Sequence, residues 1–179
     1  MNKDDLVRAI RVDGAAAVEE WRKEHPNENP NLSRCVLSRV DLRGANLAGA
    51  NLAFANLEHS YLVGAHLGHA DLSSAKLNNA VLVDANLEGA ILDEAWLEET
   101  QACRANLSSA HMHEAVLRGA DLTGANLTSA VLSEADLTGA NLNYATLDDA
   151  DLREACLTDT RCTYASFQWA NAFAAQFVR

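Results

Sequence analysis

The stretch Ala120-Asp121-Leu122-Thr123-Gly124-Ala125-Asn126-Leu127 decides the fold, because it contains a five-residue unit that the chain repeats in one unbroken frame. Leucine occupies the centre of the unit and fills 24 of the 26 central positions from 32 to 157. Alanine stands two residues earlier in 21 of 23 units between 45 and 155. Self-similarity at a fixed period is typical of a solenoid, in which each unit buries its apolar face against its neighbours.

A period of five fits neither the 3.6-residue turn of an α-helix nor the two-residue alternation of a flat strand. Within a unit, alanine and leucine are two residues apart, so a short extended segment points both side chains to the same side. The next alanine follows three residues after the leucine and returns to that side only if the chain turns between them. Each unit therefore predicts a short strand and a corner, with leucine and alanine inside and three residues outside.

The outward residues indicate how many units close one coil. Two ladders fall on a spacing of 20 residues at fixed positions of the unit: Glu94, Glu114, Glu134 and Glu154, and Asn46, Asn86, Asn106 and Asn126, with His66 at the remaining position between Asn46 and Asn86. Four units per coil align both ladders and three units break them, so we predict a square coil. Residues 31–168 would then make about seven coils, a rod roughly 34 Å long at a strand spacing of about 4.8 Å. Its core would contain the frame leucines, among them Leu42, Leu47, Leu52, Leu122, Leu127 and Leu132.

The repeated unit resembles the A-(D/N)-L-x-x unit of the pentapeptide-repeat family over residues 31–168. The resemblance implies an all-β solenoid, a right-handed quadrilateral parallel β-helix, in a family that is mostly bacterial. Most members have no assigned activity. A minority resemble duplex DNA in shape and charge, bind DNA gyrase and confer quinolone tolerance, and these usually dimerise through their C-terminal ends.

The two ends of the chain depart from the repeat. Residues 1–30 are predicted to be mainly helical, with apolar markers at Leu6, Ile10, Val18 and Trp21. This segment is either a cap over the first open coil, as solenoids require, or a partner-binding arm. In residues 169–179 the i, i+4 spacing of Trp169, Phe173 and Phe177 predicts a capping helix. Aromatic residues are enriched at interfaces, so these three are also a candidate homodimer contact.

The composition limits the classes of function. The net charge of −11 argues against direct binding to nucleic acid or to an anionic membrane. No apolar stretch approaches a membrane span, and the first residues lack the apolar core of a signal peptide, so we expect a cytoplasmic location. Motifs for catalysis or phosphate binding are missing from the sequence, so we expect no enzyme activity and no cofactor.

Acidic residues are concentrated in the later half of the rod. Residues 84–159 hold fifteen acids and three bases, whereas residues 31–83 hold three acids and four bases. The glutamate ladder would stack like charges one coil apart, which is unfavourable. It is either a face for a basic partner or a solvated face that keeps the rod soluble. The candidate partner face comprises Asp93, Glu94, Trp96, Glu98, Glu99, Glu114, Glu134 and Glu154.

One unit, residues 100–104, lacks both consensus residues, with Thr100 and Ala102 in their places. Replacing leucine by alanine in a rigid core costs about 2–5 kcal/mol. We therefore expect a bulge, a kink or a compensating neighbour. Trp96, just before this unit, is the candidate contact point.

A histidine pair on the surface raises the question of a metal site. His111 and His113 should both point outward, with Glu114, Glu94 and Asp93 nearby. A rigid metal site needs three or four converging ligands. The sequence does not establish that convergence, so the pair is interpreted as polar surface residues and no metal is predicted.

Two functional hypotheses remain. The first is a non-enzymatic interaction or scaffold protein that presents a rigid acidic rod to an unidentified protein partner. The alternative is a DNA-mimicking inhibitor of DNA gyrase or topoisomerase, with the glutamate ladder as its footprint and the C-terminal aromatic residues as a dimer contact.

Overall fold

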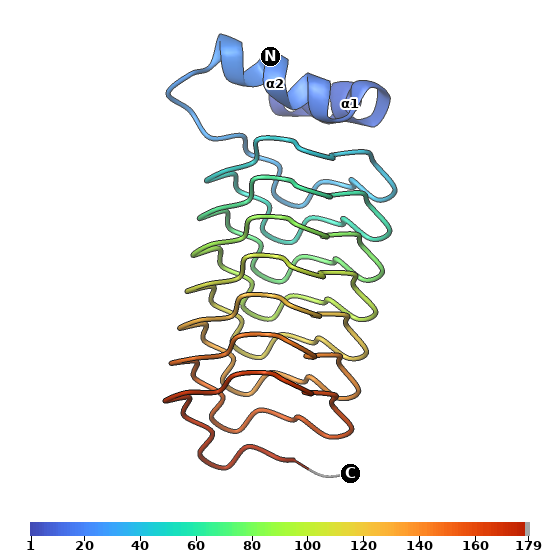
Figure 1. Ribbon diagram of the computed structural model, residues 1–179. Helices are drawn as coiled ribbons and strands as arrows, with labels where there is room; N and C mark the ends of the chain where they lie inside the picture. The colour runs from blue at the N-terminus through green and yellow to red at the C-terminus, as the bar shows by residue number, and fades with distance from the viewer. Residues whose placement is uncertain (178–179) are drawn as a thin grey trace.

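The fold consists of two short helices followed by a stack of coils, as a computed structural model shows (Figure 1). The structure describes residues 1–177. Helix α1 spans Lys3–Asp13 and helix α2 spans Ala15–Glu24. Each later unit contributes one bridge residue, and all 26 bridges are parallel and join residues 20 apart, from Asn31–Asn51 to Cys156–Gln176. One coil therefore contains four units, as the side-chain ladders predict.

Each unit turns because the second residue after the leucine has a positive φ angle. At this position Gly124 has a φ of 67° and Glu114 a φ of 55°. Glycine adopts this conformation without steric cost, whereas other residues adopt it only where surrounding bonds enforce it. The N–H of Ala125 donates back to the carbonyl of Leu122 at 2.9 Å and closes the turn. The N–H of Leu122 donates to the carbonyl of Asn141 in the next coil at 2.8 Å, which joins the two coils.

The interior of the rod is a continuous column of leucine and alanine. The predicted core residues are at most 1% exposed: Leu42, Leu47, Leu52, Leu122, Leu127 and Leu132. Burying one leucine side chain contributes about 1.5–3 kcal/mol before chain entropy is subtracted. Every buried side-chain nitrogen or oxygen in the described residues has a hydrogen-bond partner. Other molecules therefore meet this protein at its outer surface and its ends.

The helix pair covers the first coil and satisfies its carbonyl groups. The markers Leu6, Ile10, Val18 and Trp21 are buried in the same core as the first leucines of the repeat. Arg11 donates to the Val36 carbonyl at 2.8 and 3.2 Å, and the N–H of Ala15 donates to the Asp41 carbonyl at 3.0 Å. In later coils, carbonyls at these positions accept from the preceding coil. Neither helix is long and apolar enough to cross a membrane.

The predicted C-terminal capping helix is wrong for the described residues. Through residue 176 the chain instead continues the coil, with a last bridge between Cys156 and Gln176. Phe167 and Phe177 take the leucine position of the unit, whereas Trp169 takes a corner position with a φ of 57°. The β-helix thus extends beyond the predicted boundary at residue 168, and no further coil covers its last one. Residues 178 and 179 of the predicted 169–179 segment lie outside the described residues.

The irregular unit at residues 100–104 keeps the regular backbone. The N–H of Ala102 donates to the Asp121 carbonyl at 2.8 Å, so the expected bulge or kink is absent from this unit. Thr100 is buried and its hydroxyl donates to the Leu77 carbonyl at 3.0 Å. Ala102 and Met112 line one small cavity of about 10 Å³, whose apolar lining offers a water molecule no hydrogen-bond partner. Met112, two units farther along the same coil, is the other departure from leucine in the central frame and borders the same cavity.

Candidate partner-binding face

The four ladder glutamates lie at one corner of the β-helix and are exposed: Glu94, Glu114, Glu134 and Glu154. Their φ angles lie between 55° and 61°, so each is a corner residue of its coil. The N–H of Glu114 donates to the Ser133 carbonyl at 3.0 Å, and the N–H of Glu134 donates to the Arg153 carbonyl at 2.9 Å. Hydrogen bonds between coils therefore fix the backbone from which this line of carboxylates projects.

The other acids of the predicted face lie at the ladder corner and at the next corner of the same coil. Asp93 precedes the ladder, is half-buried and accepts the N–H of His113 at 2.9 Å. Glu98 and Glu99 lie one unit farther along the same coil. A carboxylate oxygen of Glu98 is 3.9 Å from the guanidinium of Arg118, so part of its charge is balanced.

Trp96 lies between the ladder corner and Glu98 and is the largest apolar group on this face. Its side chain is 49% exposed. The ammonium of Lys76, one coil earlier, is 5.9 Å from the centroid of the indole ring, close enough for a weak cation–π contact. The structure thus brings an exposed aromatic residue beside the acidic corner.

The arginines of the acidic half are paired with aspartates outside the ladder. The partners are Arg104 with Asp84 at 2.8 Å, Arg118 with Asp136 at 2.6 Å, and Arg153 with Asp151 at 2.6 Å. The hydrogen bonds from Arg104 lower the pKa of Asp84, and those from Arg153 lower the pKa of Asp151. Among the ion pairs of residues 1–177, none joins a ladder glutamate to lysine or arginine. Within the described residues, no lysine or arginine therefore offsets the charge of the ladder.

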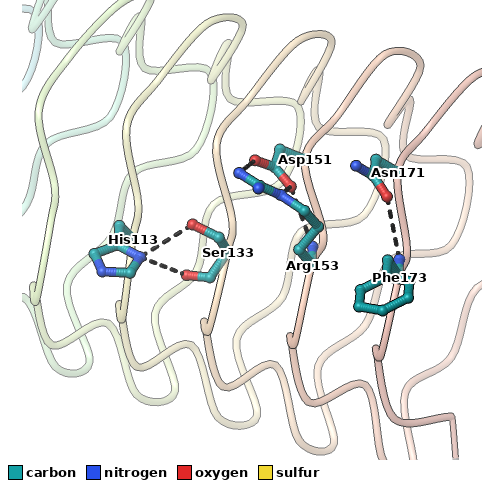
Figure 2. Close-up of polar contacts among 6 residues, drawn as sticks. All are labelled: His113, Ser133, Asp151, Arg153, Asn171 and Phe173. Carbon is teal, nitrogen blue, oxygen red and sulfur yellow. Dashed lines mark hydrogen bonds and ion pairs between the residues drawn. The ribbon is translucent and has the colours of Figure 1, made fainter.

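Sequence reasoning missed one cluster of side chains at this corner. The ligand atoms of His113, Glu114 and Glu134 lie within 4.8 Å of one another. Figure 2 shows the His113 ring turned toward Ser133 in the next coil. His111, Glu94 and Asp93, which the sequence placed near His113, are not part of this cluster. The 20-residue spacing signals that Glu114 and Glu134 are neighbours, but only the side-chain directions select these three groups.

The predicted dimer contact lies at the uncovered end of the rod. Trp169, Phe173 and Phe177 are 82%, 75% and 57% exposed. On another corner, the rings of Tyr144 and Tyr164 stack with centroids 5.2 Å apart. This end is therefore rich in exposed aromatic surface.

A family model of pentapeptide repeats matches the chain with eight repeat copies. The matched segments are residues 31–68, 65–101, 85–124 and 120–159, which together are more than half of the chain. Parallel 20-residue coils and a leucine-filled interior define the class of protein as a β-helical solenoid. Within that class, the chain belongs to the pentapeptide-repeat family.

Two solved structures of this family resemble the chain over most of its length. One is HetL, a pentapeptide-repeat protein involved in the regulation of heterocyst differentiation in the cyanobacterium Nostoc sp. strain PCC 7120. It is 32% identical, the match covers 79% of this chain and 73% of HetL, and the TM-score is 0.51. QnrB1, a plasmid-mediated fluoroquinolone resistance protein, is 18% identical over 75% of this chain and 68% of its own, with a TM-score of 0.53.

At this identity, the likeness to QnrB1 is one of fold alone. These relatives are known to form right-handed quadrilateral β-helices, in agreement with the four-unit coils seen here. A pentapeptide-repeat protein of the Arabidopsis thaliana thylakoid lumen also matches, at 28% identity over 62% of this chain and 66% of its own, with a TM-score of 0.37. A search of curated protein sequences found no significant match.

Proposed function

We propose that this protein is a non-enzymatic interaction or scaffold protein that presents a rigid acidic face to a protein partner with a basic surface. The observation that supports the proposal is the ladder of four exposed glutamates without lysine or arginine partners in the described chain. Like charges on neighbouring strands are unfavourable. A partner that supplies basic groups removes this repulsion, and its attraction to the acidic field also speeds association. Pentapeptide-repeat proteins are generally structural or interaction proteins, which favours binding over catalysis.

The face is preorganised for such a role. Its backbone is held by hydrogen bonds between coils, such as that from the N–H of Glu114 to the Ser133 carbonyl at 3.0 Å. Binding to a rigid surface costs less conformational entropy than ordering a loop does. Trp96, which is 49% exposed, adds an aromatic anchor of the kind that often contributes strongly to binding energy at interfaces.

Affinity capture from a native cell extract tests the proposal. The bait is the wild type or a variant with four Glu→Gln substitutions, at Glu94, Glu114, Glu134 and Glu154. We expect a partner that the wild type captures and the variant does not. A control with the same change in net charge neutralises four exposed acids away from the ladder: Asp13, Glu28, Asp149 and Asp159. Identical partner lists for wild type and the ladder variant would contradict the proposal, and loss with both variants would assign the effect to total charge.

A second candidate function is DNA mimicry directed at DNA gyrase or topoisomerase. A line of carboxylates along a rod supports it, because duplex DNA also presents regular negative charge. DNA carries about one charge per 1.7 Å of its axis, whereas the ladder carries one per coil of about 4.8 Å. Asp93, Glu98 and Glu99 would therefore have to contribute to the footprint. A gyrase supercoiling titration tests this function. The absence of both inhibition and protection from quinolone at micromolar protein would rule DNA mimicry out.

We also propose that the uncovered C-terminal coil is the contact of a homodimer. Trp169, Phe173 and Phe177 are exposed there. The backbone N–H of Phe167 has no backbone acceptor in the described chain, although the equivalent group of Leu147 donates to Ser166. Light scattering should give a dimer for the wild type and a monomer for a Trp169→Ser/Phe173→Ser variant. Tyr61→Ser, at a mid-rod residue that is 51% exposed, is the control. A monomeric wild type at every concentration would contradict the dimer.

A further inference from the structure

We propose that His113, Glu114 and Glu134 form a surface site for a divalent transition-metal ion such as Zn²⁺. The cluster offers one imidazole nitrogen and two carboxylate oxygens, all within 4.8 Å of one another. Zinc binds these ligand types at about 2.0–2.2 Å, which places the ligand atoms of a tetrahedral ion about 3.4 Å apart. Small rotations of exposed side chains would bring the ligand atoms from separations of up to 4.8 Å to the separation of about 3.4 Å that the ion requires. The inference does not depend on the proposed protein partner.

The orientation of the imidazole is suited to a metal ligand, because one ring nitrogen is held by Ser133 and the other faces Glu114. Nδ1 of His113 lies 3.1 Å from the carbonyl oxygen and 3.0 Å from the hydroxyl oxygen of Ser133 (Figure 2). A carbonyl oxygen only accepts, so the tautomer with its hydrogen on Nδ1 donates to it and leaves the lone pair of Nε2 available to a metal ion. Nε2 is 3.2 Å from a carboxylate oxygen of Glu114. Two acceptors at this distance repel unless a proton or a metal ion lies between them.

The contact with Ser133 is also the outer contact that metal-binding histidines typically make. Such histidines almost always donate their second N–H to a carbonyl, a carboxylate or water, which fixes the tautomer and the ring direction. The backbone N–H of His113 donates to Asp93 at 2.9 Å, so the main chain of the ligand is held as well. The first ligand is therefore oriented by groups outside the cluster.

The charge around the cluster favours a divalent ion. Arg153, one coil beyond Ser133, donates to Asp151 at 2.8 and 2.6 Å, and Figure 2 shows its guanidinium beside that carboxylate. Within residues 1–177, neither Glu114 nor Glu134 has an ion pair with lysine or arginine. A divalent ion would neutralise both stacked carboxylates.

The ladder offers this arrangement at one level only. The residue before the glutamate is Asp93, His113, Ser133 or Arg153 in the four successive coils. Imidazole nitrogen suits zinc and its transition-metal neighbours and does not suit calcium or magnesium. We therefore expect one ion per chain. Three protein ligands leave a fourth position for water or for a donor atom from another molecule.

Calorimetric titration of the full chain with zinc chloride tests the site. We expect saturable binding of one ion by the wild type. The variants His113→Gln and Glu134→Gln should weaken binding at least about tenfold, since even the loss of an outer contact costs 10–100-fold. His111→Gln and Glu154→Gln remove the same chemical groups outside the cluster, so they should bind within about twofold of the wild type.

Two results would overturn the inference. One is the absence of saturable heat at millimolar zinc. The other is unchanged binding in His113→Gln, which would assign the zinc to other groups such as the four free thiols. Circular dichroism checks that each variant folds. NMR of the imidazole nitrogens separates the two histidines, because zinc should shift Nε2 of His113 and leave His111 unchanged. Affinity capture with a chelator present tests the acidic face separately, so either proposal can fail alone.

Discussion

Arg104 and Asp84 form two parallel hydrogen bonds between adjacent coils, both 2.8 Å long. The residues are 20 positions apart, so the pair exists only because four units close one coil. These hydrogen bonds lower the pKa of Asp84. A carboxylate whose pKa is lowered by folding stabilises the folded state above its unfolded pKa, and that contribution disappears as the pH falls through the folded value.

We therefore predict that Arg104→Gln lowers the melting temperature at pH 7, and that its difference from the wild type shrinks as the pH falls below about 4, the unfolded pKa of aspartate. Thermal melts at pH 7, 5 and 3 measure this. Arg8→Gln is the control, because Arg8 meets Asp5 in a single contact of 3.6 Å, whereas Arg104 forms two hydrogen bonds of 2.8 Å. A difference that stays constant down to pH 3 would contradict the assignment.

Gly14 is predicted to be the residue of the helix pair least tolerant of substitution. It has φ 58° and ψ −128°, and a Cβ atom there would lie 2.1 Å from the Asp41 carbonyl oxygen. That oxygen accepts the N–H of Ala15, so the clash would break a bond between the helices and the first coil. Gly14→Ala should lower the free energy of unfolding by about 2–4 kcal/mol in urea titrations.

Gly64→Ala is the matched control for this change. Gly64 also has a positive φ, 63°, but no atom lies within 4 Å of a Cβ built on it. Only the conformational cost of about 1–2 kcal/mol should then apply. Equal losses for the two variants would show that the contact with Asp41 does not matter.

Arg22 is predicted to close the N-terminal end by binding carbonyl groups. It donates to the carbonyls of Asn46 at 3.1 Å, Ala48, and Glu28 at 3.2 Å. Methionine keeps much of the apolar stem of arginine and removes its hydrogen-bond donors. Arg22→Met should therefore lower the free energy of unfolding by about 1.5–3 kcal/mol, the range for hydrogen bonds to charged groups. Hydrogen exchange should show the loss first in the amides of the first coil. An unchanged exchange pattern there would argue against a capping role.

The cavity beside Ala102 should make its substitution depend on Met112. A cavity of about 10 Å³ does not accommodate the three extra carbons of leucine. Ala102→Leu alone should therefore overpack the core and lower the free energy of unfolding by about 1–3 kcal/mol. Ala102→Leu with Met112→Leu restores the consensus at both sites and should be at least as stable as the wild type. Urea titrations of the two single variants and the double variant measure the coupling. Additive effects would show that Met112 does not compensate for Ala102.

The interior could be predicted from the sequence because every unit poses the same packing problem. The spacing of Leu122 and Ala125 requires a corner between them, and the ladder of Glu94 and Glu114 sets the coil at 20 residues. The irregular unit was harder to predict. Ala102 keeps a regular backbone because hydrogen bonds to the neighbouring coil hold it, and the missing side-chain volume leaves a small cavity bordered by Met112, which a comparison of each residue with the consensus does not reveal.

The C-terminal error has an identifiable cause. The i, i+4 spacing of Trp169 and Phe173 suggests a helix, but Phe167, Ala172 and Phe177 continue the central frame. Ala165, Ala170 and Ala175 continue the alanine frame in the same coil. This signal was present in the sequence, and the neighbouring coil decides between the alternatives because it offers hydrogen bonds to an extended chain.

The cluster of His113, Glu114 and Glu134 shows the limit of sequence reasoning on the surface. The repeat places His113 and Glu114 in one coil and Glu134 in the next. It does not determine the side-chain rotamers, which depend on contacts such as that between His113 and Ser133. Outward residues are free of the packing constraint that fixes the leucines, so the repeat alone does not set the directions of their side chains.

The four-unit coil restricts how such a chain can change length in evolution. Gain or loss of 20 residues adds or removes one whole coil, and every later side chain stays in the same ladder. Gain or loss of five residues keeps leucine and alanine inside, but it rotates everything downstream by a quarter turn. A five-residue change within the ladder would therefore have little effect on folding. It would, however, divide Glu94, Glu114, Glu134 and Glu154 between two different corners of the β-helix.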